Sequence, residues 1–234
     1  MKSCYDDVFT PDPIYQEQLQ NILEFINENP VKVLDVGAGT GNLLEMISKK
    51  YPDVLVYGID NDPDMVRTAT NKYSECNNIN ISTGDATRLQ FGDGCFDFIV
   101  SNWVVHHLDN EKKRLFSNEA YRVLSGKGRL ILGDVFSSTD GEVGDVERSV
   151  KLTQSIVKRA IYYMRNVSFE RALILIAALP NFLTNKGEHL VTTNYMSGLL
   201  EEVGFRVLTI KNTSDPEYMV RIITADKNHQ SFRV

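Results

Sequence analysis

The sequence contains little cysteine, no long apolar run and no surplus of positive charge. Its three cysteines, Cys4, Cys76 and Cys95, follow no CxxC or zinc-finger spacing, so we expect reduced thiols rather than disulfides or a zinc site. The longest apolar run is the eight residues 172–179, far short of the ~20 that span a bilayer. The first residues also lack the apolar core of a signal peptide. These absences predict a soluble, cytoplasmic protein without a membrane span.

The charge balance is mildly acidic. The chain has 25 basic and 31 acidic residues and a net charge of −6, which argues against a protein held mainly by nucleic-acid phosphates. Its 234 residues are 42% hydrophobic and 24% charged, a composition typical of folded domains. We therefore expect one domain with a single elaboration.

Strand and helix patterns alternate along most of the chain. Short apolar runs predict strands at 31–36, 54–59, 79–82, 96–101, 129–134, 205–210 and 218–225. Apolar spacing and breaker residues predict helices at 14–28, 42–51, 63–73, 112–124 and 193–203. Gly126 and Gly128 indicate a turn before the fifth strand. The repeat predicts an α/β fold, a doubly wound, mostly parallel seven-stranded sheet (Rossmann-like) with helices on both faces.

One long segment interrupts this alternation. Residues 137–191 contain no convincing strand pattern and have a mostly helical one, so we expect a helical lid inserted after the fifth strand. The division that follows is an amino-terminal arm and helix at 1–30, a cofactor-binding core at 31–136 and 192–234, and the lid at 137–191. Such an insertion lies at the carboxyl edge of the sheet, where folds of this kind bind ligands.

A glycine cluster follows the first predicted strand. Gly37, Gly39 and Gly41 lie between that strand and a predicted helix, where glycine lets a ligand approach the backbone. Asp60 ends the second strand, nineteen residues after Gly41, and can accept hydrogen bonds from a ribose diol. Asp35, at the end of the first strand, is a carboxylate beside the loop. It would repel a pyrophosphate and attract a cation.

Two other uses of the loop fit less well. A phosphate P-loop needs Gly-Lys-Ser/Thr at its end, and Gly41 is followed by Asn42. A dinucleotide fingerprint has the spacing G-x-G-x-x-G, and here the third glycine comes one position early. A nicotinamide-dependent dehydrogenase is therefore disfavoured by this spacing and by Asp35.

The loop resembles that of the class I S-adenosylmethionine-dependent methyltransferases, whose D/E-x-G-x-G-x-G motif matches Asp35, Gly37, Gly39 and Gly41. The resemblance is dense over 31–136 and loose over 193–225. It implies S-adenosylmethionine as cofactor and S-adenosylhomocysteine as product. It also implies that Asp60 binds the ribose and Asp85 the adenine amine. The cofactor-binding residues expected on this basis are Asp35, Gly37, Ala38, Gly39, Gly41, Asp60, Asn61, Met65, Gly84, Asp85, Ala86, Asn102, Trp103 and Val104.

Some of these positions have structural alternatives. Asp85 can serve as a turn residue, and Trp103 can belong to the core. Asp62 is better explained as the cap of the helix that Pro63 opens than as a ligand-binding residue.

His106 and His107 follow the fourth predicted strand, close to where the transferred methyl group would point. A histidine with an ordinary pKa near ~6.5 can take a proton from a hydroxyl, a thiol or an acidic carbon, so both are candidate catalytic residues. Helix capping or packing is the alternative. No spacing of His, Cys and carboxylate residues predicts a metal site, and Asp134 and Asp140 are explained as ordinary loop acids.

The acceptor side is predicted from aromatic residues. Tyr162 and Tyr163 in the insertion, with Tyr5, Phe9 and Tyr15 in the arm, would suit a small, partly hydrophobic substrate. The basic residues of the insertion can meet an anionic substrate, but a solvated face is the favoured interpretation; they are Lys158, Arg159, Arg165 and Arg171.

We thus expect a methyltransferase that acts on an oxygen, carbon or nitrogen of a small metabolite, as a monomer or homodimer. A protein of the same fold that binds the cofactor without methylating is one alternative. A methyltransferase for RNA or protein is another, although methyltransferases of amide and nucleobase nitrogens often carry N/D-P-P-Y/F where this chain has Ser101-Asn-Trp-Val.

Overall fold

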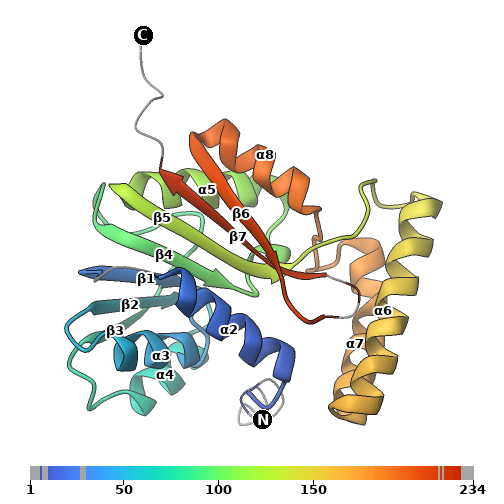
Figure 1. Ribbon diagram of the computed structural model, residues 1–234, viewed down its shortest axis with the longest axis horizontal. Helices are drawn as coiled ribbons and strands as arrows, with labels where there is room; N and C mark the ends of the chain where they lie inside the picture. The colour runs from blue at the N-terminus through green and yellow to red at the C-terminus, as the bar shows by residue number, and fades with distance from the viewer. Residues whose placement is uncertain (1–5, 7–9, 27–29, 216, 218, 228–234) are drawn as a thin grey trace.

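The structure is a computed structural model that describes residues 6, 10–26, 30–215, 217 and 219–227. Seven strands of these residues form one sheet in the order β3-β2-β1-β4-β5-β7-β6 (Figure 1). In that order they are β3 (Ile79–Thr83), β2 (Leu55–Asp60), β1 (Lys32–Val36), β4 (Phe96–Asn102), β5 (Leu124–Val135), β7 (Val220–Lys227) and β6 (Phe205–Asn212). Only β7 runs antiparallel to its neighbours, so the predicted mostly parallel, doubly wound sheet is confirmed.

The strand order reverses between β1 and β4. The chain proceeds from β1 outward to β2 and β3, and then returns to the other side of β1 to form β4. In open α/β sheets a crevice forms at the carboxyl ends of the strands at such a point. The topology therefore places the ends of β1 and β4 at the expected ligand site.

Helices cover both faces of the sheet, as the near-continuous apolar pattern of a parallel strand requires. One face packs against α5 (Asn110–Val123) and α8 (Thr193–Val203), and the other against α2 (Pro13–Phe25) and α3 (Asn42–Lys50). α4 (Pro63–Lys72) lies along β2 and β3. The two apolar layers hold the strand ends in fixed positions.

The helix starts follow from local capping. Asp12 accepts hydrogen bonds from the backbone N–H groups of the first turn of α2, and Thr192 does the same for α8. Asp62 caps α4, as expected, by accepting from the backbone N–H of Asp64 at 2.8 Å. Gly204 ends α8 in the left-handed conformation, with φ of 114°.

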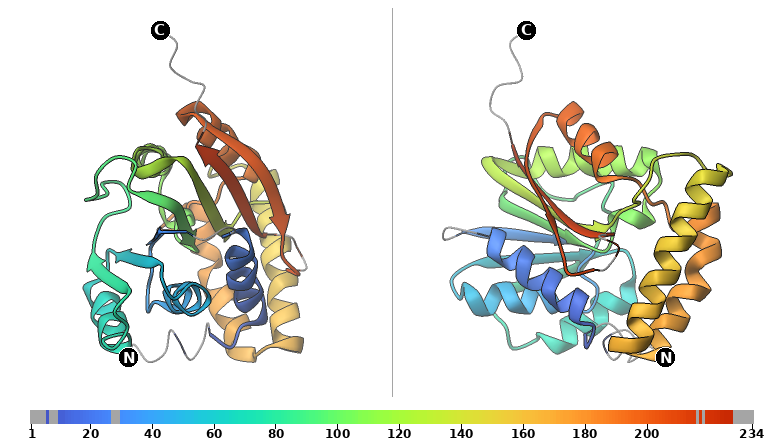
Figure 2. Two further views of the ribbon diagram at one scale, coloured as in Figure 1. Left: turned by 60° about the vertical axis from the view of Figure 1, so that its left-hand side comes forward. Right: turned by 45° about the vertical axis from the view of Figure 1, so that its right-hand side comes forward.

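The insertion after β5 consists of α6 (Val146–Asn166) and α7 (Phe169–Thr184), which pack against each other beyond the edge where β4 and β5 end (Figures 1 and 2). The described residues 137–191 contain no strand. Two small cores join the pair to Val135 at the end of β5 and to Met219 and Val220 at the start of β7. The helical character expected of this segment is therefore present, and its role as a lid stays a prediction.

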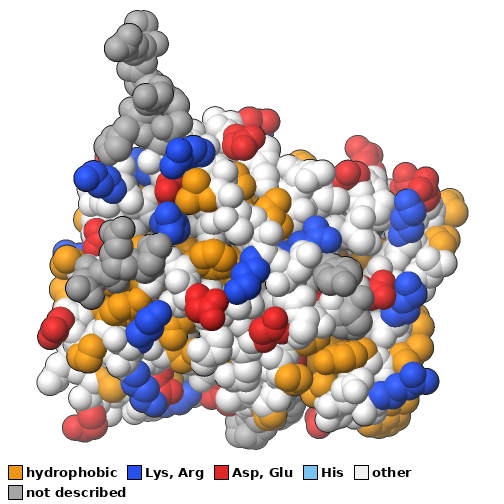
Figure 3. All heavy atoms as spheres, viewed as in Figure 1, with side chains coloured by type: hydrophobic (Ala, Val, Ile, Leu, Met, Phe, Trp, Pro, Cys, Tyr) orange, Lys and Arg blue, Asp and Glu red, His pale blue; other side chains and the backbone are white. Residues whose placement is uncertain are grey.

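The outer surface of the insertion is partly apolar. Hydrophobic side chains are visible over this end of the molecule in Figure 3. The most exposed of them on the two helices are Val146, Val150, Met164, Phe169 and Leu173. The apolar run 172–179 is thus divided between core and surface.

A few boundaries differ from the prediction. The segment with Gly126 and Gly128 is not a turn: β5 begins at Leu124 and absorbs the extra residues in an irregularity opposite Phe96–Phe98. Residues 27–29, predicted as the end of the first helix, and Tyr218, the predicted start of the last strand, lie outside the described residues.

Candidate active site

Two cavities adjoin at the carboxyl edge of the sheet. The glycine-loop cavity, of about 260 Å³, lies over the ends of β1, β2 and β4. The insertion cavity, of about 190 Å³, lies between the sheet edge and α6 and α7. Trp103 and His107 line both cavities, so these two side chains form a shared wall. A group bound in one cavity can therefore lie next to a group bound in the other.

Most of the residues predicted to bind the cofactor line the glycine-loop cavity. They are Gly37, Gly39, Asp60, Asn61, Met65, Gly84, Asp85, Ala86, Asn102, Trp103 and Val104. Asp35, Ala38 and Gly41 do not reach its described wall: Ala38 is packed in the core, and Gly41 faces the ring of Tyr73. The cavity is also lined by Asp62, which the sequence assigned only to helix capping.

The glycine loop leaves room for a ligand at one position in particular. Gly39 has φ of 54°, and a Cβ added there would meet nothing within 4 Å. Its backbone N–H donates to Asp60 Oδ2 at 2.8 Å, which ties the loop to the end of β2. At Gly37, by contrast, a Cβ would lie 2.1 Å from the Val104 side chain, so this glycine allows the loop to pack against the end of β4. The open side at Gly39, called the open cradle below, leaves room for a ligand to approach the backbone.

Asp35 is buried beneath the loop in the central strand. Its register partners are Gly58 on β2 and Val100 on β4. Burial, and then the nearby carboxylate of Asp60, raise the pKa of Asp35 to about 8. A cation bound above the loop would favour the ionised form, so Asp35 can act on a ligand through its charge without touching it.

Asp60 and Asp85, which line the cavity, organise turns. Asp60 Oδ1 accepts from the backbone N–H of Asp62 at 2.9 Å. Asp85 Oδ1 accepts from the backbone N–H and the hydroxyl of Thr87, each at 2.8 Å, and these bonds lower the pKa of Asp85. Asp85 thus has the turn role considered from the sequence and also lines the cavity.

Trp103 adopts a left-handed backbone conformation with φ of 56°, which is uncommon for a bulky residue. This conformation costs free energy, so the surrounding contacts must impose it. Its backbone N–H donates to Gly133 O at 2.8 Å, and its indole N–H donates to Gln18 of α2. The ring of Tyr15 meets it edge-on, with centroids 5.0 Å apart. These contacts fix the indole as the wall between the cavities.

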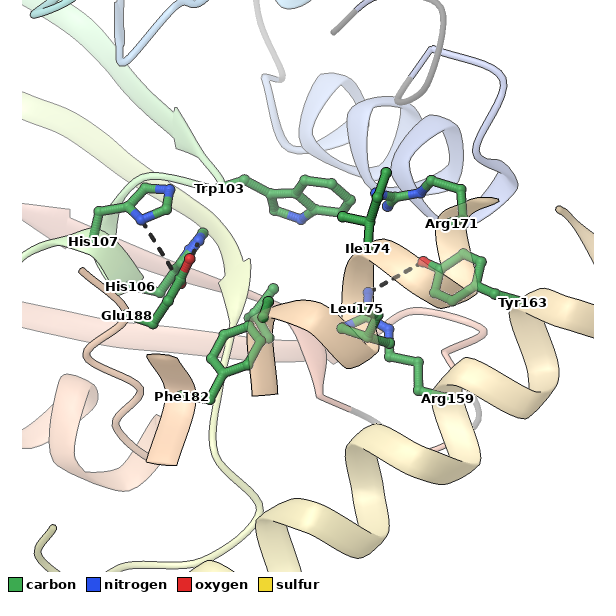
Figure 4. Close-up of a pocket in the computed structure, with 12 residues that line it drawn as sticks. Trp103, His106, His107, Arg159, Tyr163, Arg171, Ile174, Leu175, Phe182 and Glu188 are labelled. Atoms are coloured by element: carbon green, nitrogen blue, oxygen red, sulfur yellow. Dashed lines mark hydrogen bonds and ion pairs between the residues drawn. The ribbon is translucent and has the colours of Figure 1, made fainter. Parts of the chain in front are cut away.

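The insertion cavity has apolar sides and two polar ends (Figure 4). The sides are formed by Val135, Ile174, Leu175, Ala178 and Phe182. His106, His107 and Glu188 lie at one end, and Arg159, Tyr163 and Arg171 lie toward the other. This arrangement suits a small acceptor with an apolar body.

His106 is buried and oriented by Asp134 of β5. Its Nδ1–H donates to Asp134 Oδ1, and its backbone N–H donates to Asp134 Oδ2 at 3.1 Å. Burial alone would lower the pKa of His106, but the carboxylates of Asp134 and Glu188 outweigh it and raise the pKa. The lone pair of the neutral imidazole is thereby assigned to Nε2, which lies 3.5 Å from Glu188 Oε2.

Sequence reasoning missed Glu188, because it lies about eighty residues after the histidines, in the segment that returns from α7. Two contacts position that segment: the backbone N–H of His189 donates to His106 O, and the ammonium of Lys113 donates to His189 O at 2.8 Å. Burial lowers the pKa of Lys113 to about 8. Glu188 Oε2 also lies 3.7 Å from His107 Nδ1, so these three residues are the described group that can hold a metal ion.

The interpretation of the basic residues as a solvated face is wrong for two of the four. Arg159 and Arg171 are buried, whereas Lys158 and Arg165 are exposed. Arg159 pairs with Asp215 at 3.0 Å and Arg171 with Asp12 at 2.6 Å, and each compensates a fully buried carboxylate.

Of the predicted substrate-binding residues, Tyr163 lines the insertion cavity. Tyr162 contacts the Tyr163 ring at a centroid distance of 5.9 Å and does not reach the described cavity wall. Tyr15 packs behind Trp103 instead of lining the cavity. Tyr5 and Phe9 lie outside the described residues.

The chain is similar in sequence to known methyltransferases. Residues 33–128 match the family described as "Methyltransferase domain". The chain is 30% identical to malonyl-[acyl-carrier protein] O-methyltransferase 1 of Coxiella burnetii, over 58% of this chain and 44% of that protein. It is 32% identical to demethylmenaquinone methyltransferase of Thermotoga maritima, over 48% of each chain.

A solved S-adenosylmethionine-dependent methyltransferase from Aquifex aeolicus has the same fold, with a TM-score of 0.63 and 19% identity over 94% of this chain and 95% of that one. The family match over residues 33–128, the curated relatives and the shared fold together support a class I S-adenosylmethionine-dependent methyltransferase. The chain spans about half the length of the curated relatives it matches. None of its described helices has the length and hydropathy to cross a bilayer.

The cofactor of this methyltransferase family, S-adenosylmethionine, fits the glycine-loop cavity. Gly39 presents an open backbone, Asp60 offers carboxylate oxygens for a ribose, and the buried Asp35 can balance a positive charge.

Proposed function

We propose that this chain transfers the methyl group of S-adenosylmethionine to a small-molecule acceptor held in the insertion cavity. The observation that carries the proposal is the shared wall of Trp103 and His107 between the two cavities. A donor in the glycine-loop cavity and an acceptor in the insertion cavity would meet at this wall. We expect a monomer or homodimer acting on a metabolite rather than on nucleic acid.

Methyl transfer from a sulfonium mainly requires that the two reactants are positioned correctly. The acceptor atom attacks the methyl carbon, the bond from carbon to sulfur breaks, and its electron pair stays on sulfur, so a neutral thioether leaves. A protein accelerates such a step mainly by holding the reactants in line and excluding water. The apolar sides of the insertion cavity suit both tasks.

His106 and His107 stay the predicted catalytic residues. In this proposal the acceptor's reacting group lies at the end of the cavity that contains them. Asp134 holds the Nδ1 proton of His106, so the Nε2 lone pair is available to take the acceptor's proton. Asp134 is a positioning residue that acts through His106.

Blocking one cavity tests the proposal. Ala178 lines the insertion cavity, so Ala178→Trp should fill it, whereas Ala177→Trp places the same ring on an exposed position of the same helix. We expect Ala178→Trp to bind S-adenosylhomocysteine in calorimetry as the unaltered protein does. Its transfer of labelled methyl groups into a metabolite extract should fall at least tenfold.

The Ala177→Trp control should keep both properties. The proposal fails if the unaltered protein releases no S-adenosylhomocysteine with any fraction of the extract. It also fails if Ala178→Trp and Ala177→Trp transfer methyl groups equally well.

A further inference from the structure

Three side chains with metal-binding chemistry converge at the polar end of the insertion cavity. His106 Nε2 and His107 Nδ1 lie 3.5 Å and 3.7 Å from the same oxygen, Glu188 Oε2. The three ligand atoms all lie within 4.8 Å of one another. A tetrahedral ion with ligand distances of about 2.0–2.2 Å needs donor atoms about 3.3–3.6 Å apart, which the two distances to Glu188 approach. Two imidazoles and one carboxylate are a common ligand set for Zn²⁺ and other divalent transition metals.

The surroundings of His106 support the same use. Metal-ligating histidines usually donate their second ring N–H to a carboxylate or carbonyl, which fixes the tautomer and strengthens the ligand. Asp134 does this for His106 from a buried position on β5. The backbone N–H of Val135, at 2.6 Å, and that of His106 hold the Asp134 carboxylate in turn.

Glu188 provides an independent observation. Its Oε2 atom is buried and accepts no hydrogen bond from any described residue. A buried carboxylate oxygen without a donor is costly, so it requires a partner. Of the two imidazole nitrogens nearest to it, neutral His106 offers a lone pair at Nε2. His107 Nδ1 lies 2.9 Å from Gly187 O and offers a lone pair in the tautomer whose proton is on Nε2, so an ion would take the place of that hydrogen bond. A cation between the three atoms would satisfy Glu188 and both nitrogens at once.

We propose that His106, His107 and Glu188 bind one divalent transition-metal ion, with an open coordination position facing the insertion cavity. Zn²⁺ is the ion that the ligand set fits most directly. His107 is the most accessible of the three side chains, at 53% exposure, which gives the ion a path from solvent. The site borders the glycine-loop cavity, because His107 lines both cavities, whereas His106 and Glu188 line only the insertion cavity.

The use of the ion rests on the proposed function, although its binding does not. A hydroxyl group of the acceptor at the open position would become more acidic and give its proton to water, as metal-bound water does, which leaves the oxygen as the nucleophile. The oxygen then forms its bond to the methyl carbon as the bond from that carbon to sulfur breaks. The ion replaces the proton-accepting role of His106, whose Nε2 lone pair becomes a metal ligand. An oxygen acceptor is therefore the substrate class that this site favours.

Cobalt(II) binding to the full chain tests the site without turnover. The protein is dialysed against a chelator and then titrated with Co²⁺, followed by its visible absorption and by calorimetry; Zn²⁺ should displace the cobalt. We expect one Co²⁺ per chain. Glu188→Gln and His107→Ala should each weaken binding at least tenfold, and Asp134→Asn by roughly 10–100-fold through the orientation of His106.

His189→Ala is the matched control, because it removes a neighbouring histidine that is outside the cluster, and it should bind Co²⁺ normally. Unchanged S-adenosylhomocysteine binding by Glu188→Gln will show that this variant is folded. The proposal is overturned if Co²⁺ does not bind, or if Glu188→Gln and the unaltered protein bind it equally. Methyl transfer that persists in chelator would refute the catalytic use of the ion and leave the proposed function standing.

Discussion

The two cavities are built in different ways. The glycine-loop cavity is formed by residues at or just after the ends of β1, β2, β3 and β4, and each contributes a short local segment. The insertion cavity combines Trp103, His106 and His107 with residues 159–188 of the insertion. The sheet topology therefore determines the glycine-loop cavity, whereas the insertion cavity depends on how one inserted helix pair docks. On the proposed function, the choice of acceptor can change without disturbing the glycine-loop cavity.

Loss of the docking ion pair should have the largest effect. Arg171 compensates Asp12, which is fully buried and caps α2, so Arg171→Met leaves a buried carboxylate without its cation. We expect the free energy of unfolding to fall by about 3 kcal/mol. Urea denaturation measures this change, with exposed Arg165→Met as a control that should stay within about 0.5 kcal/mol. Equal effects of the two variants would contradict the docking role of Arg171.

The second prediction concerns a substitution that fills the glycine-loop cavity. Gly39→Leu places a side chain in the open cradle, and we expect S-adenosylhomocysteine affinity to fall about 100-fold, which corresponds to ~2.7 kcal/mol. Gly144→Leu is the matched control, because Gly144 also has positive φ and open space but lies in the loop before α6. Calorimetry on both variants separates cavity filling from backbone strain. Similar losses of S-adenosylhomocysteine affinity in the two variants would contradict the placement of the ligand beside Gly39.

A smaller effect concerns the charge of Asp35. The pKa of this carboxyl is raised to about 8 from 3.8, so unliganded protein should lose stability as the pH rises from about 4 to 8. The positive sulfonium of S-adenosylmethionine favours the ionised form of Asp35, and the neutral thioether of S-adenosylhomocysteine does not. The affinity ratio of S-adenosylmethionine to S-adenosylhomocysteine should therefore rise with pH up to about 8, by at most tenfold per pH unit. Asp35→Asn should remove this pH dependence, and a ratio that rises equally in Asp35→Asn would exclude Asp35 as its source.

The sequence predicted the sheet and grouped most of the residues that line the glycine-loop cavity, because their signals are local. Gly39 and Asp60 each follow a strand, and parallel strands end at one edge, so their proximity follows from the fold class. The order of the strands and the antiparallel direction of β7 did not follow, because neither depends on a local pattern. The acceptor cavity was harder still, since Glu188 meets His106 only through the return of the chain after α7.

Arg159 did carry a signal that the sequence interpretation passed over. It lies three residues after Ile156 and four before Tyr163, on the same buried stripe of α6. A charged residue on an apolar stripe requires a buried partner, and Asp215 provides it from the segment before β7. The identity of that partner could not be read from the helix alone.

The most direct test of two adjoining sites is a crystal structure of the protein with S-adenosylhomocysteine. We predict that the ribose will lie at Asp60 and that the sulfur will face Trp103 and His107, within about 4 Å of this shared wall. A thioether that faces away from the insertion cavity, or a ligand bound outside the glycine-loop cavity, would contradict the account.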